Sequence, residues 1–179
     1  MDAGDRDEAG GRAGPALGWR PMTVDDLDAV AGLALLGFPD HFEGRPCFEN
    51  RLALFPRGCF VLAETGGAPR GYLVAYPWRA DAAPTLNTLI AALPEDAAVF
   101  YLHDIALHPD ARGAGRSGAI VERLADQARA DGWPGIALVA VNDAAGFWAR
   151  HGFAVRDTPE MAAKLASYGP DACYMVRPL

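Results

Sequence analysis

The sequence predicts a single-domain α/β protein in which helices flank a mixed sheet. Its 179 residues are the length of one domain, and an apolar fraction of 51% supplies enough side chains for a continuous core. Strand-like and helix-like segments follow one another in the order β, α, α, β, β, β, α, β, α and, near the end, β. The clearest pair is an amphipathic helix at 116–130 followed by a nearly all-apolar strand at 136–141.

The chain begins with 16 acidic, glycine-rich residues that lack an apolar centre. We expect residues 1–16 to form a disordered tail and not a signal peptide, and residues 17–179 to form the domain. No run approaches the roughly 18 apolar residues of a membrane span, so no membrane partner is expected. A net charge of -7 argues against nucleic acid as a partner.

Two helices are predicted ahead of the first hairpin. Thr23 followed by Asp26 matches a capping box, and the helix that begins there stops before Pro39. A second short helix is predicted over residues 46–55. Between the two helices, residues 38–45 form an irregular segment rich in Phe, Pro and His.

A hairpin and an insertion follow. Residues 59–64 and 71–76 are predicted strands around a glycine-rich turn. Residues 79–98 are predicted to be an insertion in which Thr85 caps a short helix, and insertions of this length often border a binding site. The remaining predicted elements are strands at 99–107, 136–141, 153–156 and 173–177, and helices at 116–130, from Asn142 or Asp143 to 150, and at 158–169.

A glycine-rich loop joins the strand at 99–107 to the helix at 116–130. Glycines let the backbone approach a ligand closely and adopt positive φ. The first helical turn supplies N–H groups without intrahelical partners and the positive end of the dipole, which suits a phosphate or pyrophosphate. The loop consists of Arg112, Gly113, Ala114, Gly115, Arg116, Ser117 and Gly118.

Other interpretations of this loop stay open at this point. A Walker A loop needs a lysine that the segment lacks. Gly113-x-Gly115-x-x-Gly118 matches the Rossmann fingerprint, but the next strand ends in Asn142 and not in the acid that binds a ribose. A third interpretation is that the loop only connects the strand to the helix and binds no ligand.

The wider segment resembles the GNAT acetyltransferase family, whose central motif is Arg/Gln-x-x-Gly-x-Gly/Ala between a strand and a helix. Residues Arg112 to Ser117 fill this motif, with Ser117 in place of the usual last Gly or Ala. The strand end at 105–109 and the run at 142–153 resemble two further family motifs. Residues 19–27 resemble the family's opening strand and helix, so the resemblance covers nearly the whole folded chain.

The resemblance implies a GNAT fold, with a mixed, mostly antiparallel sheet of about six to seven strands that splays between its central strands. It also implies acetyl-CoA as cosubstrate, with the pantetheine arm between the strands at 99–107 and 136–141. Asn142 would hydrogen-bond near the arm, cap the next helix, or do both. The implied coenzyme-binding residues are Ile105, Ala106, Leu107, Arg112, Gly113, Ala114, Gly115, Arg116, Ser117, Gly118, Asn142 and Trp148.

The implied reaction is direct attack of a primary amine, from a small molecule or a peptide, on the thioester of acetyl-CoA. A backbone N–H near Leu107 is the expected oxyanion donor. The family's tyrosine acid is replaced by Trp148, whose indole is not a useful proton donor. Thiolate is a tolerable leaving group, so this loss does not prevent catalysis.

Candidate catalytic residues precede the motif at Tyr101, His103 and Asp104. Histidine is the residue type best suited to proton transfer near neutral pH, so His103 is the leading base. Strand alternation places Tyr101 and His103 on one face and Asp104 on the other, unless a bulge intervenes. Alternatively, His103 is a structural histidine paired with a carboxylate, and Asp104 is a satisfied buried acid.

The acceptor site is expected between residues 38–45, 78–82 and 85–93. Aromatic side chains there would form an apolar wall, and acidic ones would attract a cationic amine; these are Phe38, Phe42, Trp78, Asp40, Glu43 and Asp81. Alternatively, these aromatic side chains pack at the edge of the domain in the ordinary way, and the acidic ones belong to a solvated loop.

Two other functions compete with an acetyltransferase: a non-catalytic acyl-CoA-binding module, suggested by Trp148, and a nucleotide-binding oxidoreductase. Three scattered cysteines form neither a disulfide framework nor a metal pair, which indicates reduced thiols in the cytoplasm. Four scattered histidines give no zinc spacing, so no metal is expected. A homodimer, common in the resembling family, stays possible.

Overall fold

The computed structural model describes residues 16–179, so the predicted tail, apart from Ala16, lies outside the described residues. Seven strands form one sheet: β1 (Gly18–Pro21), β2 (Cys59–Ala63), β3 (Gly71–Trp78), β4 (Val99–Leu107), β5 (Gly135–Ala140), β6 (Ala154–Val155) and β7 (Cys173–Pro178). The helices are α1 (Leu27–Gly37), α2 (Arg45–Leu54), α3 (Arg116–Ala130), α4 (Ala145–Arg150) and α5 (Pro159–Ala166), with short 3-10 turns η1 (Val24–Asp26), η2 (Pro56–Gly58) and η3 (Pro109–Ala111).

The strands run in the order β1-β2-β3-β4-β5-β7-β6. Every neighbouring pair in this sheet is antiparallel except β4 and β5, which are parallel and connected through α3. The prediction of a mixed, mostly antiparallel sheet is confirmed. A doubly wound parallel sheet, as the Rossmann alternative requires, is not what this chain forms.

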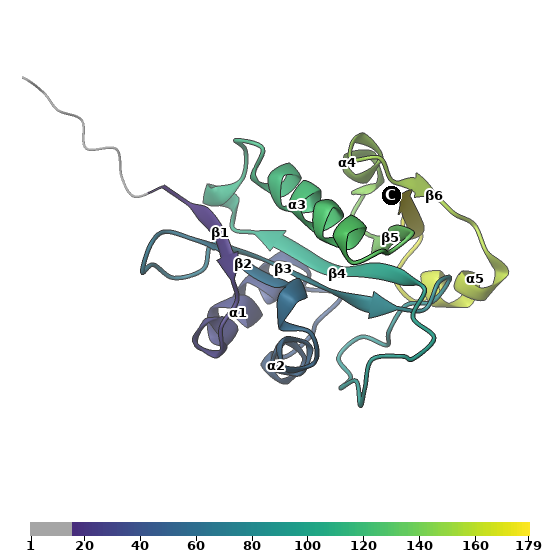
Figure 1. The fold of residues 1–179 in the computed structure, drawn as a ribbon, viewed down its shortest axis with the longest axis horizontal. Helices are drawn as coiled ribbons and strands as arrows, with labels where there is room; N and C mark the ends of the chain where they lie inside the picture. The colour runs from purple at the N-terminus through teal and green to yellow at the C-terminus, as the bar shows by residue number, and fades with distance from the viewer. Residues whose placement is uncertain (1–15) are drawn as a thin grey trace, which may run out of the picture.

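Helices cover both faces of the sheet (Figure 1). One core cluster packs α1 and α2 against the sheet through residues such as Val30, Phe48 and Tyr72. The other packs α3 and α4 against the opposite face through residues such as Leu124 and Trp148. The α3 helix has the bounds predicted from its apolar face, because Gly132 beyond its end takes a left-handed φ of 80°.

The short helix predicted from Thr85 is wrong, since residues 79–98 contain no helical turn. Side chains of α2 take the hydrogen bonds that a helix would have used internally. Asn50 accepts from the N–H of Ile90 at 2.9 Å and donates to its carbonyl at 3.0 Å, and Arg51 donates to the Thr88 carbonyl at 2.6 Å. The 79–98 segment is therefore fastened to α2 by tertiary contacts that local sequence does not report.

The predicted cap of the helix after β5 is also wrong. Its N-cap is Ala144, which makes no side-chain cap, while Asn142 and Asp143 both take left-handed backbone conformations with φ of 54° and 57°. Asp171 supplies the compensating contact, because its carboxylate accepts from the N–H of Asp143 at 2.9 Å. A carboxylate brought from just before β7 thus stabilises the turn after β5.

Candidate active site

The central strands part to create a cavity. β4 and β5 pair only at Phe100–Ile136 and Tyr101–Ala137, and beyond Tyr101 they diverge. A cavity of about 460 Å³ occupies the gap, lined by β4 from Tyr101 to Leu107 and by Leu138, Val139 and Val141 on the other side. The predicted splay is therefore present.

One end of the cavity meets the start of α3. Gly113, Ala114 and Gly115 have successive left-handed φ values of 83°, 52° and 67°, and Gly115 is the N-cap of the helix. Gly115 in the left-handed region followed by the helical Arg116 is the change of hand that directs consecutive N–H groups to one concave donor site. The indole of Trp19 in β1 donates to the Arg116 carbonyl at 2.9 Å, which fixes the helix end to the sheet.

The loop residues do not all have the same surroundings. Arg112 and Ser117 line the cavity, whereas Gly113, Ala114, Gly115, Arg116 and Gly118 do not. A Cβ at Gly118 would lie 2.9 Å from the His151 ring, so a larger residue there would have to displace that ring. Arg112 donates to the Leu107 carbonyl at 3.2 Å, which holds a positive charge beside the end of β4.

The end of β4 presents backbone groups to the gap. The N–H of His108 donates to the Arg70 carbonyl at 2.8 Å, on the β3 side. Because adjacent residues in a strand direct their N–H groups to opposite edges, the N–H of Leu107 faces β5 and the cavity. This is where the predicted oxyanion donor and the Ile105–Leu107 binding segment lie.

A bulge in β4 changes which side chains share a face. Val74 of β3 is opposite Asp104, but the next residue, Ala75, is opposite Leu102, so His103 is the extra residue. His103 contacts the rings of Tyr76 and Tyr101, and Asp104 is bonded to Tyr72, all on the α1–α2 side of the sheet. The bulge that the sequence analysis allowed for is present, so simple alternation does not separate His103 from Asp104, and both line the cavity.

His103 belongs to a buried ionisable cluster. Its Nε2 lies 2.5 Å from Oε2 of Glu43, and these side chains are 4% and 5% exposed. Burial acts to raise the pKa of Glu43, but the charge and hydrogen bond of His103, the charge of Arg51 and the Asn87 N–H together hold that pKa below its ordinary value. Glu43 is therefore an ionised carboxylate that orients the His103 ring.

Asp104 has a different environment. The Tyr72 hydroxyl donates to its carboxylate at 2.5 Å. Burial raises the pKa of Asp104 to about 6, even though the charge of His103 and the bond from Tyr72 oppose the rise. Burial also raises the pKa of Tyr101 well above its ordinary range, so its phenol stays neutral.

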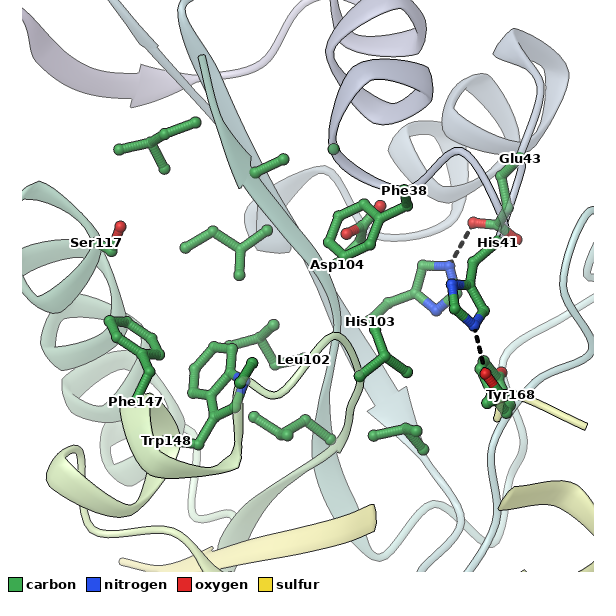
Figure 2. Close-up of a pocket in the computed structure, with 18 of the residues that line it drawn as sticks. Phe38, His41, Glu43, Leu102, His103, Asp104, Ser117, Phe147, Trp148 and Tyr168 are labelled. Atoms are coloured by element: carbon green, nitrogen blue, oxygen red, sulfur yellow. Dashed lines mark hydrogen bonds and ion pairs between the residues drawn. The ribbon is translucent and has the colours of Figure 1, made fainter. Parts of the chain in front are cut away.

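Trp148 and Phe147 form an aromatic wall at the end of the cavity beside α3, which we call the coenzyme end after the predicted ligand (Figure 2). Trp148 is 6% exposed and packs edge-on against Phe147 and Phe153. Asn142, by contrast, is exposed and does not line the cavity. Its expected contact with a pantetheine arm thus stays a prediction.

The opposite end of the cavity, which we call the acceptor end, is formed by Phe38, His41, Glu43, His103 and Tyr168 (Figure 2). Leu86 also belongs to it, because its neighbour Asn87 donates to Glu43. The sequence analysis named Phe38 and Glu43 correctly as neighbours of this region. Four other expected members do not line the cavity. Phe42 is 49% exposed, Trp78 packs on the core, Asp81 pairs with Arg156, and Asp40 lies outside the lining as well.

Tyr168 was missed because it follows α5, far from any motif. His41 Nε2 lies 2.8 Å from the Tyr168 carbonyl, and the two rings stack with centroids 5.5 Å apart. The α1–α2 connection and the α5–β7 connection therefore meet beside the cavity. Only the tertiary structure reveals this contact, since 127 residues separate its partners.

Comparison with known proteins identifies the family. The sequence model of the Acetyltransferase (GNAT) family matches residues 26–153. The chain belongs to this family. A search of curated proteins finds no match to the sequence.

Solved structures share the fold at low sequence identity. Ard1 from Thermoplasma volcanium superposes with a TM-score of 0.69 at 15% identity, covering 92% of this chain and 98% of that one. Naa20 from Chaetomium thermophilum, in complex with a bisubstrate analogue, gives 0.68 at 17% identity over 90% and 86%. The GNAT-like decarboxylase GphF, in complex with isobutyryl-CoA, gives 0.70 at 18% identity over 90% and 98%.

Proposed function

We propose that the protein transfers an acetyl group from acetyl-CoA to a primary amine of a small molecule or peptide. One observation carries the proposal: a single cavity in the β4–β5 gap extends from the first turn of α3 to the His103–Glu43 pair. An anion site and a candidate base at the two ends of one cavity suit a long, phosphate-bearing thioester and an amine that meets it. Structural neighbours that hold isobutyryl-CoA or a bisubstrate analogue support this assignment.

The coenzyme end would hold the acyl-CoA through its backbone. The first-turn N–H groups of α3 and the concave site at 115–116 would bind the pyrophosphate, with Arg112 and Arg116 supplying charge. Backbone groups of Ile105, Ala106 and Leu107 would pair with the pantetheine arm. The N–H of Leu107, which faces the gap, would donate to the oxyanion.

His103 would act as the general base. With Nε2–H donating to the Glu43 carboxylate, Nδ1 carries the lone pair that takes a proton from the substrate ammonium. The freed amine attacks the thioester carbonyl carbon, the C–S bond breaks, and the sulfur leaves as thiolate. The acetyl group ends on nitrogen, and the second amine proton passes to solvent or to the thiolate.

Trp148 leaves the usual acid position without a proton donor. A thiolate leaves without protonation, because a thiol pKa near 8.5 makes the anion accessible at neutral pH. The same residue is the observation that favours a second candidate function, a non-catalytic acyl-CoA-binding module. Such a module would bind the thioester and turn over no amine.

Titration calorimetry with acetyl-CoA, CoA and NAD tests the proposal first. Binding of both CoA compounds in the micromolar range, with no response to NAD, is the expected result. Thiol release in the presence of an amine panel then separates the enzyme from the binding module. Absence of CoA binding would remove the basis for both functions.

The three cysteines, Cys47, Cys59 and Cys173, are all free thiols. We propose a cytoplasmic location on this ground, because free thiols persist in a reducing compartment. No helix within residues 16–179 has the length and apolar character needed to cross a bilayer.

A further inference from the structure

The charged side chains that line the cavity are unevenly distributed between its two ends. Of the described residues that line the cavity, Arg112 is the one that carries a guanidinium or ammonium group, and it lies at the coenzyme end on the Leu107 carbonyl. Two carboxylates, Glu43 and Asp104, line the other part. Nothing placed there is suited to pair with an acidic group on the acceptor.

Lys164 carries its Nζ 5.6 Å from the centre of the Tyr168 ring but does not line the cavity. The other basic side chains around the acceptor end are already engaged. Arg51 is 1% exposed at its side chain, lies 3.6 Å from Glu43 and donates to the Thr88 carbonyl, so no substrate reaches it. His41 donates from Nε2 to the Tyr168 carbonyl. His103 is paired with Glu43, so the Nε2 atoms of both histidines already have partners within the protein.

The carboxylates are engaged as well. Glu43 accepts from His103, and its other oxygen accepts from the Asn87 N–H at 3.0 Å. Asp104 accepts from Tyr72. These acids repel a carboxylate or phosphate on the acceptor, and hydrogen bonds already occupy both oxygens of Glu43.

The rest of the acceptor end is apolar or aromatic. Phe38 and Leu86 enter it from the α1–α2 connection and from the 79–98 segment, and the Tyr168 ring stacks on His41 at its far side (Figure 2). Apolar walls with a few fixed polar groups favour a ligand whose body is uncharged. Aromatic rings also favour an ammonium carried on such a body.

We infer that the acceptor is a compact primary amine whose remaining part is apolar and carries no carboxylate, phosphate or second ammonium group. The inference rests on the proposed acetyltransferase function and narrows its substrate class. A free amino acid is excluded by its carboxylate, and a polyamine by its second charge.

A matched set of acceptors tests the inference with the full chain and acetyl-CoA. Phenethylamine and phenylalanine share a skeleton and differ by the carboxylate, phenylalaninamide keeps the bulk without the charge, and putrescine adds a second ammonium. Thiol release is expected to give phenethylamine a kcat/KM at least tenfold above those of phenylalanine and putrescine, with the amide closer to phenethylamine. Equal or better use of phenylalanine or putrescine overturns the inference and leaves the transferase function standing.

A charge placed in the acceptor end should reverse the preference. Leu86→Arg puts a guanidinium where Leu86 lines the cavity, and should shift the phenylalanine-to-phenethylamine ratio of kcat/KM by tenfold or more toward the acid. Leu89→Arg is the matched control, because Leu89 lies in the same segment, is 65% exposed and does not line the cavity. An equal shift in both variants contradicts a local charge effect.

Binding distinguishes failure of the inference from failure of the proposed function. If acetyl-CoA binds but no amine is acetylated, the transferase function fails. The acceptor class is then judged by calorimetry on the CoA-saturated protein. Binding of phenethylamine without phenylalanine upholds it, whereas binding of both alike, of phenylalanine alone, or of neither overturns it.

Discussion

Glu43 Oε2 lies 2.5 Å from His103 Nε2, and this contact joins the irregular segment before α2 to the bulge of β4. Glu43 also accepts from Asn87 in the 79–98 segment, so one carboxylate ties three separate parts of the chain together. A catalytic histidine needs a fixed tautomer and ring orientation, and this contact supplies both. Replacing Glu43 with glutamine removes the charge of this side chain and keeps its shape.

Glu43→Gln should lower kcat by about 10- to 100-fold, because the amide still accepts from Nε2–H but no longer stabilises the imidazolium formed when the amine loses its proton. The acidic limb of the kcat/KM profile should move to lower pH for the same reason. Glu49→Gln is the control, since Glu49 pairs with Arg45 on the surface of α2. An unchanged pH profile would show that Glu43 has only a structural role.

His103→Ala should reduce kcat by about 10²–10⁴-fold while leaving the Kd for acetyl-CoA within about twofold, as expected for a general base outside the coenzyme site. Steady-state kinetics and calorimetry measure the two quantities. Asp104→Asn provides the comparison, because the amide oxygen still accepts from Tyr72. A larger kcat loss in that variant than in His103→Ala would identify Asp104 as the base.

Ser117→Glu should weaken binding of both CoA and acetyl-CoA by at least tenfold. Ser117 lies in the first turn of α3 and lines the cavity, so a carboxylate there occupies the anion site and repels a pyrophosphate. Ser117→Ala should leave the Kd within about threefold, since the proposed contact is through backbone N–H groups. Equal losses in the two variants would place the anion elsewhere.

Asp104→Asn should change how stability depends on pH. An unfolded aspartate titrates near pH 3.9, whereas burial raises the folded pKa of Asp104 to about 6. The folded chain thus binds this proton more tightly, so the contribution is complete below about pH 4 and is lost as pH rises through about 6. Urea unfolding between pH 4 and 7 should show a smaller fall from this source in the variant, and parallel curves for the two proteins would contradict the shift.

Local pattern predicted the elements that depend on local contacts. β4 and α3 were predicted over the residues they occupy, because a nine-residue apolar strand and a helix with one apolar face are self-evident in sequence. The loop between them was also predicted, through glycines whose positive φ the structure confirms. These features need no knowledge of distant residues.

The errors share one physical origin, which is a partner supplied from far along the chain. The 79–98 segment forms no helix because Asn50 and Arg51 satisfy its backbone, and Asn142 is not a cap because Asp171 holds that turn. A carboxylate partner for His103 was one of the predicted alternatives, but Glu43 was expected to attract the amine and was not named as that partner, which lies 60 residues away. In all three places, a hydrogen bond from a residue distant in sequence determined the local structure.

The bulge at His103 also determines which side chains of β4 face each side of the sheet. The extra residue lets two consecutive ionisable side chains, His103 and Asp104, face the same side of the sheet. Odd-numbered residues face that side before the bulge, and even-numbered residues face it after the bulge. Deleting residue 103 would therefore remove the bulge together with the imidazole. Leu102 and Asp104 would then be neighbours in a regularly alternating strand, so the residues on either side of the bulge would keep the faces that they have now.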